Sequence, residues 1–225
     1  MSASSRIEQA ASILRTAYGK IDLSCNDATW SRFLRTLIGI ASDHASNTVL
    51  SELLQSSPLI SPRESAAAST GQLLELLKPI PRGPQKASVV RAVAAWWLET
   101  FGEEPSPAWS ASVSSYRESL RQIRGLGPAT VDDLLLFAAD LPVFPVDRTA
   151  LRVAVRHAWL DLPVEDDDAQ SLFVRSTELS SQGLQELSRL LTKVGESHCG
   201  REPLCDGCPL QSLLPDGGPR NPLSC

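Results

Sequence analysis

The sequence lacks any apolar run long enough to cross a lipid bilayer, and it contains little of the apolar–polar alternation that is typical of β-strands. Its first residues, MSASSRIEQAASIL, lack the charged and then apolar segments of a secretory signal. Leucine- and alanine-rich stretches at helical spacing are common instead. We therefore expect an all-α protein with no membrane partner, a monomer that stays in the cytoplasm.

A net positive charge is also missing, since the formal net charge is −5 and the pI is near 5.3. This balance counts against a tight, nonspecific binder of nucleic acid. A local basic patch can still hold phosphate, and Arg117, Arg121 and Arg124 lie close together in the sequence. Two interpretations of these arginines stay open: a phosphate-binding patch, or a solvated helix face.

A glycine-rich turn follows these arginines at Gly125-Leu126-Gly127-Pro128. The two glycines allow positive φ angles on both sides of a buried Leu126, and Pro128 suits the first position of a helix. Backbone N–H groups at such a turn, where it enters a helix N-terminus, can bind a phosphate without reading sequence. An ordinary corner between two helices is the alternative interpretation.

Asp147 lies 20 residues after Gly127, beyond one predicted helix and an extended segment over 141–146. The sequence predicts that its side chain caps a helix that begins at Arg148. A carboxylate in this position can cap a helix and still face a pocket.

The segments IRGLGPATVDDLLLF and PVFPVDRTALRV resemble the helix-hairpin-helix and the following Gly/Pro-Asp loop of the endonuclease III superfamily of DNA glycosylases. The resemblance implies that the hairpin grips the backbone of double-stranded DNA and that Asp147 is the essential carboxylate. It also implies two helical lobes with the DNA between them. The hairpin residues that it assigns to DNA contact are Arg124, Gly125, Leu126, Gly127, Pro128, Ala129 and Thr130.

Family members that also cut the DNA backbone carry a lysine where this chain has Ala129. The resemblance therefore implies that the Schiff-base nucleophile is absent. The wording G-L-G-P-x-T-V-D-D is closer to the lysine-less, endonuclease III-related branch. We expect base removal that leaves an abasic site, without efficient strand cleavage.

Two further DNA contacts follow from the resemblance. The segment LLKPIPRGPQKA is similar to a DNA-facing family loop and contributes Lys86, although a proline-stiffened connector explains it equally well. The glutamine that many relatives wedge into the duplex aligns with Ile40, which implies an apolar wedge.

Four of the five cysteines lie near the end of the chain, as Cys199-x5-Cys205-x2-Cys208 and Cys225. In a reducing compartment this spacing indicates a metal centre, either zinc or an iron–sulfur cluster. The flanking GESHC and CDGCPL resemble the family's iron–sulfur loop and favour a [4Fe–4S] cluster. The first gap is one residue shorter than the family's, and the fourth cysteine expected near Leu214 is missing. Cys225 is the expected replacement through a longer loop, and a site without a fourth ligand is the alternative. A three-cysteine site that His198 completes is a weaker alternative.

We expect two lobes, one formed by residues 27–140 and the other by 1–26 with 141–225. The predicted function is a monofunctional, nucleoid-associated DNA glycosylase of base excision repair. The competing hypothesis is a catalytically inactive helix-hairpin-helix protein that binds DNA and carries a structural metal cluster. The acidic pI, Ala129 and the irregular cysteine spacing favour the second hypothesis, whereas the presence of Asp147 favours the first.

Overall fold

A computed structural model describes residues 3–23, 28–38, 44–55, 58–175 and 178–220. Within these residues the chain forms helices joined by loops, and the only β pairing is an isolated bridge between Cys199 and Pro203. The predicted all-α fold is confirmed. No helix among the described residues is long and apolar enough to span a membrane.

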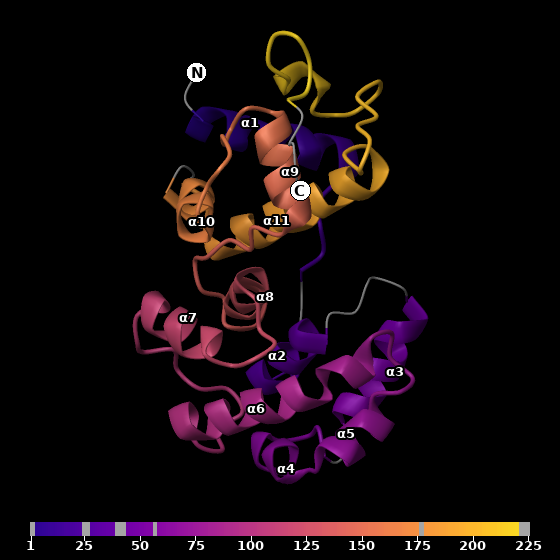
Figure 1. Cartoon of the computed structure of the whole chain (residues 1–225), viewed down its shortest axis with the longest axis vertical. Helices are drawn as coiled ribbons and strands as arrows, with labels where there is room; N and C mark the ends of the chain where they lie inside the picture. The colour runs from indigo at the N-terminus through magenta and orange to yellow at the C-terminus, as the bar shows by residue number, and fades with distance from the viewer. Residues whose placement is uncertain (1–2, 24–27, 39–43, 56–57, 176–177, 221–225) are drawn as a thin grey trace. The chain divides into compact units, whose positions relative to one another are not determined.

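The chain divides into two compact units (Figure 1). Unit 1 contains Met1–Ser24 and Asp140–Cys225, and unit 2 is the continuous segment Cys25–Ala139. The helices of unit 2 are α2 (Thr29–Ile38), α3 (His44–Leu54), α4 (Pro62–Ala67), α5 (Thr70–Leu76), α6 (Gly83–Phe101), α7 (Val113–Arg121), α8 (Pro128–Asp133) and the π-helix η1 (Leu134–Ala138). The helices of unit 1 are α1 (Ala3–Tyr18), α9 (Arg148–Arg156), α10 (Asp166–Arg175), α11 (Ser181–Ser197) and the short 3₁₀ helix η2 (Gln211–Leu213).

Unit 2 is built around α6, which packs against α2, α4 and α5. The buried side chains of α2 recur at helical spacing, because an amphipathic helix turns one stripe toward the core. They are Trp30, Phe33, Leu34, Leu37 and Ile38. Aromatic rings meet edge to face across this packing, with the centroids of Trp30 and Trp97 separated by 5.2 Å. Such contacts add specific geometry to the burial of apolar area.

Two proline-containing segments of unit 2 begin helices. One holds α4, whose N-cap Ser61 accepts a hydrogen bond from the Glu64 N–H, and Pro62 occupies the first turn. The other is the segment LLKPIPRGPQKA, interpreted from the sequence as a loop, in which α6 begins at Gly83. In both places a proline lies within the first helical turn, where it starts a helix rather than breaking one.

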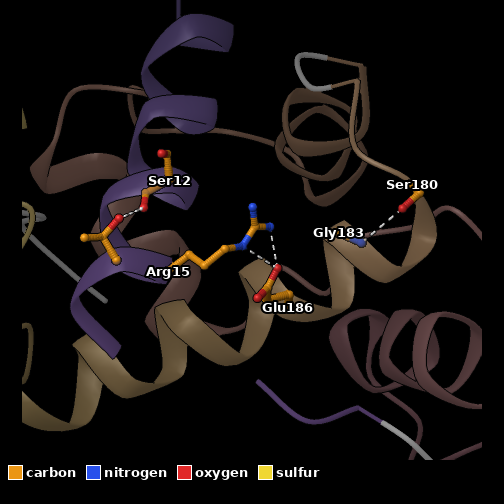
Figure 2. Close-up of polar contacts among 6 residues, drawn as sticks. Ser12, Arg15, Ser180, Gly183 and Glu186 are labelled. Carbon is orange, nitrogen blue, oxygen red and sulfur yellow. Dashed lines mark hydrogen bonds and ion pairs between the residues drawn. The ribbon is translucent and has the colours of Figure 1, made fainter. Parts of the chain in front are cut away.

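Unit 1 packs α9 and α1 against α11, and α10 against α1. The apolar stripe of α11 is buried, with Leu184, Leu187, Leu190, Leu191 and Val194 in the core. Arg15 of α1 donates to the Glu186 carboxylate of α11 through Nε, at 2.9 Å, and through Nη2 (Figure 2). This ion pair joins two segments of the chain that are 171 residues apart.

Candidate functional site

The glycine turn joins α7 to α8 as the sequence predicts. Leu126 is buried, and its N–H donates to the carbonyl of Ile123 at 3.1 Å. Gly125 has φ +98°, whereas Gly127 has φ −83° and serves as the N-cap of α8. Only one of the two glycines therefore uses the left-handed region, and Pro128 occupies the first helical turn as predicted.

The two glycines differ in what a side chain would meet. A Cβ at Gly125 would lie 2.8 Å from Cγ2 of Val89, while a Cβ at Gly127 would meet no atom within 4 Å. Packing within the unit thus requires glycine at position 125 but not at 127. The exposed surface at Gly127 and Pro128 leaves open space directly before the first N–H groups of α8.

A buried ion pair holds α7 against α8. Arg117 donates from Nε to Oδ1 of Asp132 at 2.7 Å and from Nη2 to Oδ2 at 3.1 Å, and the two side chains are 13% and 3% exposed. A bidentate pair of this kind fixes the angle between two elements as well as their separation. Arg117 is therefore part of the scaffold of the turn, whereas Arg124 is exposed beside it.

The structure gives Lys86 a partner within unit 2. Its Nζ donates to the carbonyl of Leu37 at 2.8 Å, near the end of α2. Burial lowers the pKa of the Lys86 ammonium, and the nearby charge of Asp133 partly opposes this shift. The ammonium thus stabilises a helix C-terminus, where positive charge is favourable. Ile40, the predicted wedge, lies outside the described residues.

Asp147 caps α9, which confirms its predicted structural role. Its Oδ1 accepts a hydrogen bond from the N–H of Ala150 at 2.7 Å, and the residue is exposed. Two residues further on, Thr149 abuts α11, where a Cβ at Gly195 would lie 2.1 Å from Cγ2 of Thr149. The absence of a side chain at Gly195 lets α11 approach the start of α9 closely and so helps to fix Asp147.

The three described C-terminal cysteines line one cavity in unit 1. Cys199 is buried and Cys205 and Cys208 are half-buried, and all three are unbridged. Burial raises the pKa of the Cys208 thiol, and the neighbouring charges of Cys199 and Cys205 add to this shift. Cys225 lies outside the described residues, and Leu214, near which the family's fourth cysteine was expected, also lines the cavity.

Two arginines of α9 hold this cysteine loop. Arg156 is 4% exposed, and its Nη1 lies 3.2 Å from the Sγ of Cys199 and 2.8 Å from the carbonyl of Gly200. Arg152 donates from Nε to the carbonyl of Cys199 at 2.6 Å. These contacts fix the position of Cys199 and of the loop that follows it.

The cysteine side chains offer the donor type that zinc and iron–sulfur clusters share. Within the described part of the chain, no three ligand side chains are close enough to hold one metal ion. The same three cysteines nevertheless line one cavity.

The sequence interpretation missed Arg152, Arg156 and His157. The four-residue spacing of the two arginines places them on one helix face, and that is the only signal that could have singled them out. Cys199, which both arginines contact, is more than 40 residues away in the sequence, so no local sequence pattern predicts these contacts. His157, directly after α9, lines the cysteine cavity and is 3% exposed. Burial lowers its pKa.

The chain resembles curated proteins of DNA repair over part of its length, and no protein-family model matches it. It is 25% identical over 143 residues to a protein of Methanocaldococcus jannaschii that is provisionally named a DNA repair glycosylase, which covers 63% of this chain and 65% of that protein. It is 34% identical over 93 residues to endonuclease III of Sulfolobus acidocaldarius, or 41% of each chain. The chain thus matches less than two-thirds of the length of these relatives.

Solved structures match over nearly the whole chain. A trapped covalent complex of endonuclease III with DNA has a TM-score of 0.70 and covers 96% of this chain and 98% of its own, at 16% identity. A thermostable thymine-DNA glycosylase has a TM-score of 0.67 and covers 93% of this chain and 95% of its own, at 14% identity. At these identities the likeness shows the fold. This chain thus has the fold of endonuclease III and of a thymine-DNA glycosylase, and part of its sequence resembles DNA repair glycosylases of the endonuclease III type.

Proposed function

We propose that this protein is a monofunctional DNA glycosylase, which hydrolyses the N-glycosidic bond of a damaged or mismatched base and leaves an abasic site. The names of the archaeal relatives support a role in DNA repair. The observation that carries the proposal is Asp147, an exposed carboxylate whose orientation is fixed by its hydrogen bond to the N–H of Ala150.

The glycine turn is the proposed contact with the DNA backbone. Gly127 and Pro128 are exposed at the start of α8, and the Cβ-free surface at Gly127 lets a phosphate approach the backbone closely. N–H groups at a helix start favour an anion in this position. Exposed Arg124 adds positive charge beside the turn. These contacts position the duplex and carry no sequence information.

Asp147 is the proposed catalytic residue. A glycosylase extrudes the target nucleotide from the stack, because the bond to be cleaved is inaccessible inside a duplex. Cleavage of the N-glycosidic bond develops positive charge on the sugar. A fixed carboxylate stabilises that charge and orients the attacking water, and it needs no reorganisation because the helix cap already holds it.

The residue at position 129 sets the proposed product. Ala129 carries no amine, so the chain has no nucleophile there to form a Schiff base with the sugar. The expected product is therefore an intact strand with an abasic site. Lys86 is not a substitute, since its Nζ donates to the carbonyl of Leu37.

A [4Fe–4S] cluster is the proposed cofactor, held by Cys199, Cys205 and Cys208. When bound, it supplies a structural crosslink, since base hydrolysis needs no electron transfer. The chain's own contribution is the pair of arginines on α9 that fix the cysteine loop and place Arg201 on it. Exposed Arg201 is available there for DNA phosphate.

The test is a panel of duplex oligonucleotides, each with one lesion, incubated with the wild type and with Asp147→Asn, and analysed with and without hot alkali. Asparagine caps a helix as well as aspartate does, so the variant keeps α9 while losing the charge. We expect strand breaks only after alkali, and a loss of about 10³-fold or more in the variant, because a fixed charge at the reacting centre is removed.

Breaks without alkali in the wild type would contradict the monofunctional assignment. Activity that persists in Asp147→Asn would remove the catalytic role of Asp147. If no lesion in the panel is excised but the protein still binds duplex DNA, the result would favour a catalytically inactive DNA-binding protein. Asp168→Asn, which makes the same change at an exposed carboxylate in the first turn of α10, is the matched control for loss of one negative charge in unit 1.

A further inference from the structure

His157 is a buried histidine with an unsatisfied ring nitrogen in the wall of the cysteine cavity. The residue is 3% exposed, and its Nδ1 has no hydrogen-bond partner. A buried polar atom without a partner costs about 1–3 kcal/mol, so native proteins rarely leave one. An atom or group that occupies the cavity would satisfy it.

The rest of the ring is held in place. The ring faces the backbone of Leu213, which partly opposes the lowering of the His157 pKa by burial. The ring also packs against Trp159, with centroids 5.5 Å apart. A histidine that binds metal through one nitrogen usually donates the other N–H to a backbone carbonyl or carboxylate, which fixes the tautomer.

A [4Fe–4S] cluster needs four protein ligands, one for each iron atom, and the described cysteines provide three. Leu214, where a fourth cysteine was expected from the resemblance, lines the same cavity and offers no donor. His157 and Leu214 line the same cavity.

We propose that Nδ1 of His157 is the fourth protein ligand of the cluster, which makes the site Cys₃His. The inference rests on the cluster proposed above. A neutral imidazole in place of a thiolate lowers the negative charge of the site by one unit. The adjacent Arg156 guanidinium, 3.2 Å from the Sγ of Cys199, lowers it further. Both effects raise the reduction potential of an iron–sulfur centre.

His198 is the natural alternative, because it lines the same cavity. It is only half-buried, so water can satisfy its ring nitrogens, whereas the ring of His157 is sealed from solvent. His198 therefore provides a matched control, a histidine in the same wall that is not assigned to iron. Cys225 provides the second control.

The experiment measures iron and sulfide content, visible absorbance and pulsed electron paramagnetic resonance on the full chain, purified without oxygen and reduced with dithionite. Wild type is prepared with ¹⁴N-histidine and with ¹⁵N-histidine. We expect a hyperfine coupling from a directly bound imidazole nitrogen that changes with the isotope. We expect the same coupling in His198→Ala and Cys225→Ser.

The decisive variant is His157→Cys, which keeps a ligand at the position. It should retain iron and sulfide, lose the nitrogen coupling and show a lower midpoint potential. His157→Leu should lose most of the bound iron. If His157→Leu fails to fold, His157→Cys still decides the question.

Failure of the two proposals is distinguishable. A wild-type protein that contains zinc or no metal overturns the cluster and, with it, the histidine ligand. A full complement of iron and sulfide without imidazole coupling overturns only the histidine ligand. Loss of the cluster in Cys225→Ser, together with its retention in His157→Leu, would also overturn only the histidine ligand.

Discussion

Gly125 and Gly127 are separated by one residue, yet the structure assigns them different physical roles. Gly125 has φ +98°, and an added Cβ would approach Val89 to 2.8 Å. Gly127 has a negative φ and open space where its Cβ would be. The first glycine is therefore required for folding. The second is not required by packing within the unit, since a Cβ there would meet open space.

This difference predicts opposite outcomes for two alanine variants. Gly125→Ala should lower the free energy of unfolding by about 2 kcal/mol, because it combines a left-handed backbone with a steric contact. Gly127→Ala should lower it by less than about 1 kcal/mol, the cost of a poorer N-cap. Gly127→Ala should nevertheless weaken duplex binding several-fold. Urea unfolding and fluorescence anisotropy measure the two effects. Unchanged DNA binding by a folded Gly127→Ala would exclude the turn from the interface.

Residue-scale sequence reasoning succeeded where the signal is local. The helix cap at Asp147 and the buried Leu126 follow from neighbours within three residues, and both are present in the structure. The roles of Arg156 and His157 could not be predicted, because their partners lie in a loop more than 40 residues away. Lys86 was assigned to a DNA-facing loop because the segment LLKPIPRGPQKA resembles one in the family, and the structure places the residue in the first turns of α6.

At the scale of elements, the helices predicted best are those with one wide apolar stripe. The stripes of α2 and α11 are visible in the sequence because burial imposes a period of 3.6 residues. The six-residue α4 was missed, since it is too short to show a period and its start depends on the cap at Ser61. Packing between elements was not predictable in detail, as the contact of Gly195 with Thr149 shows.

The contact between α9 and α11 predicts a rescue by paired substitutions. Gly195→Ala places a Cβ 2.1 Å from Cγ2 of Thr149, so it should destabilise the protein by about 1–3 kcal/mol and displace the start of α9. Thr149→Ser removes that methyl group and leaves the nearest contacts at 3.3 and 3.4 Å. The double variant should therefore recover more than half of the lost stability.

A double-mutant cycle in urea gives the coupling energy between the two positions. The same four proteins should rank in the same order for excision activity, because Asp147 lies two residues before Thr149. Simple additivity of the two single changes would mean that α9 and α11 are not in close contact at this point.

The ion pair between α1 and α11 predicts how stability depends on pH (Figure 2). The hydrogen bond and the charge of Arg15 lower the pKa of Glu186 in the folded state. A carboxylate whose folded pKa is depressed contributes stability above its unfolded pKa of about 4.3 and loses it as the pH falls through the folded pKa. Arg15 is half-exposed, so solvent screening limits the contribution to about 1 kcal/mol.

We therefore expect Glu186→Gln to be less stable than wild type at pH 7 by about 1 kcal/mol. The difference should stay constant down to about pH 5 and shrink toward zero near pH 3. Glu75→Gln, which breaks the exposed pair with Lys78 in unit 2, is the matched control and should have almost no effect. A difference that persists at pH 3 would show that packing, and not charge, connects α1 to α11.

At the scale of the whole molecule, the two units are stabilised in different ways. Unit 2 is one continuous segment with an aromatic core around Trp30, Phe33 and Trp97. Unit 1 combines two distant segments of the chain, and its cysteine loop is attached to α9 by Arg152 and Arg156. Metal binding would therefore stabilise unit 1 directly, because ligands that are far apart in an unfolded chain are held together.

Cys208→Ser tests this difference through hydrogen exchange followed by mass spectrometry. We expect faster exchange in α9 and in the C-terminal half of α11, whose backbone leads into the cysteine loop, and unchanged exchange in α2 and α6. Trp30, Trp96, Trp97 and Trp109 all belong to unit 2, so most of the tryptophan fluorescence should also stay unchanged. Faster exchange throughout both units would instead mean that they unfold as one cooperative body. The cysteine loop would then stabilise the glycine turn as well as Asp147, and every cysteine variant would lose DNA binding together with excision.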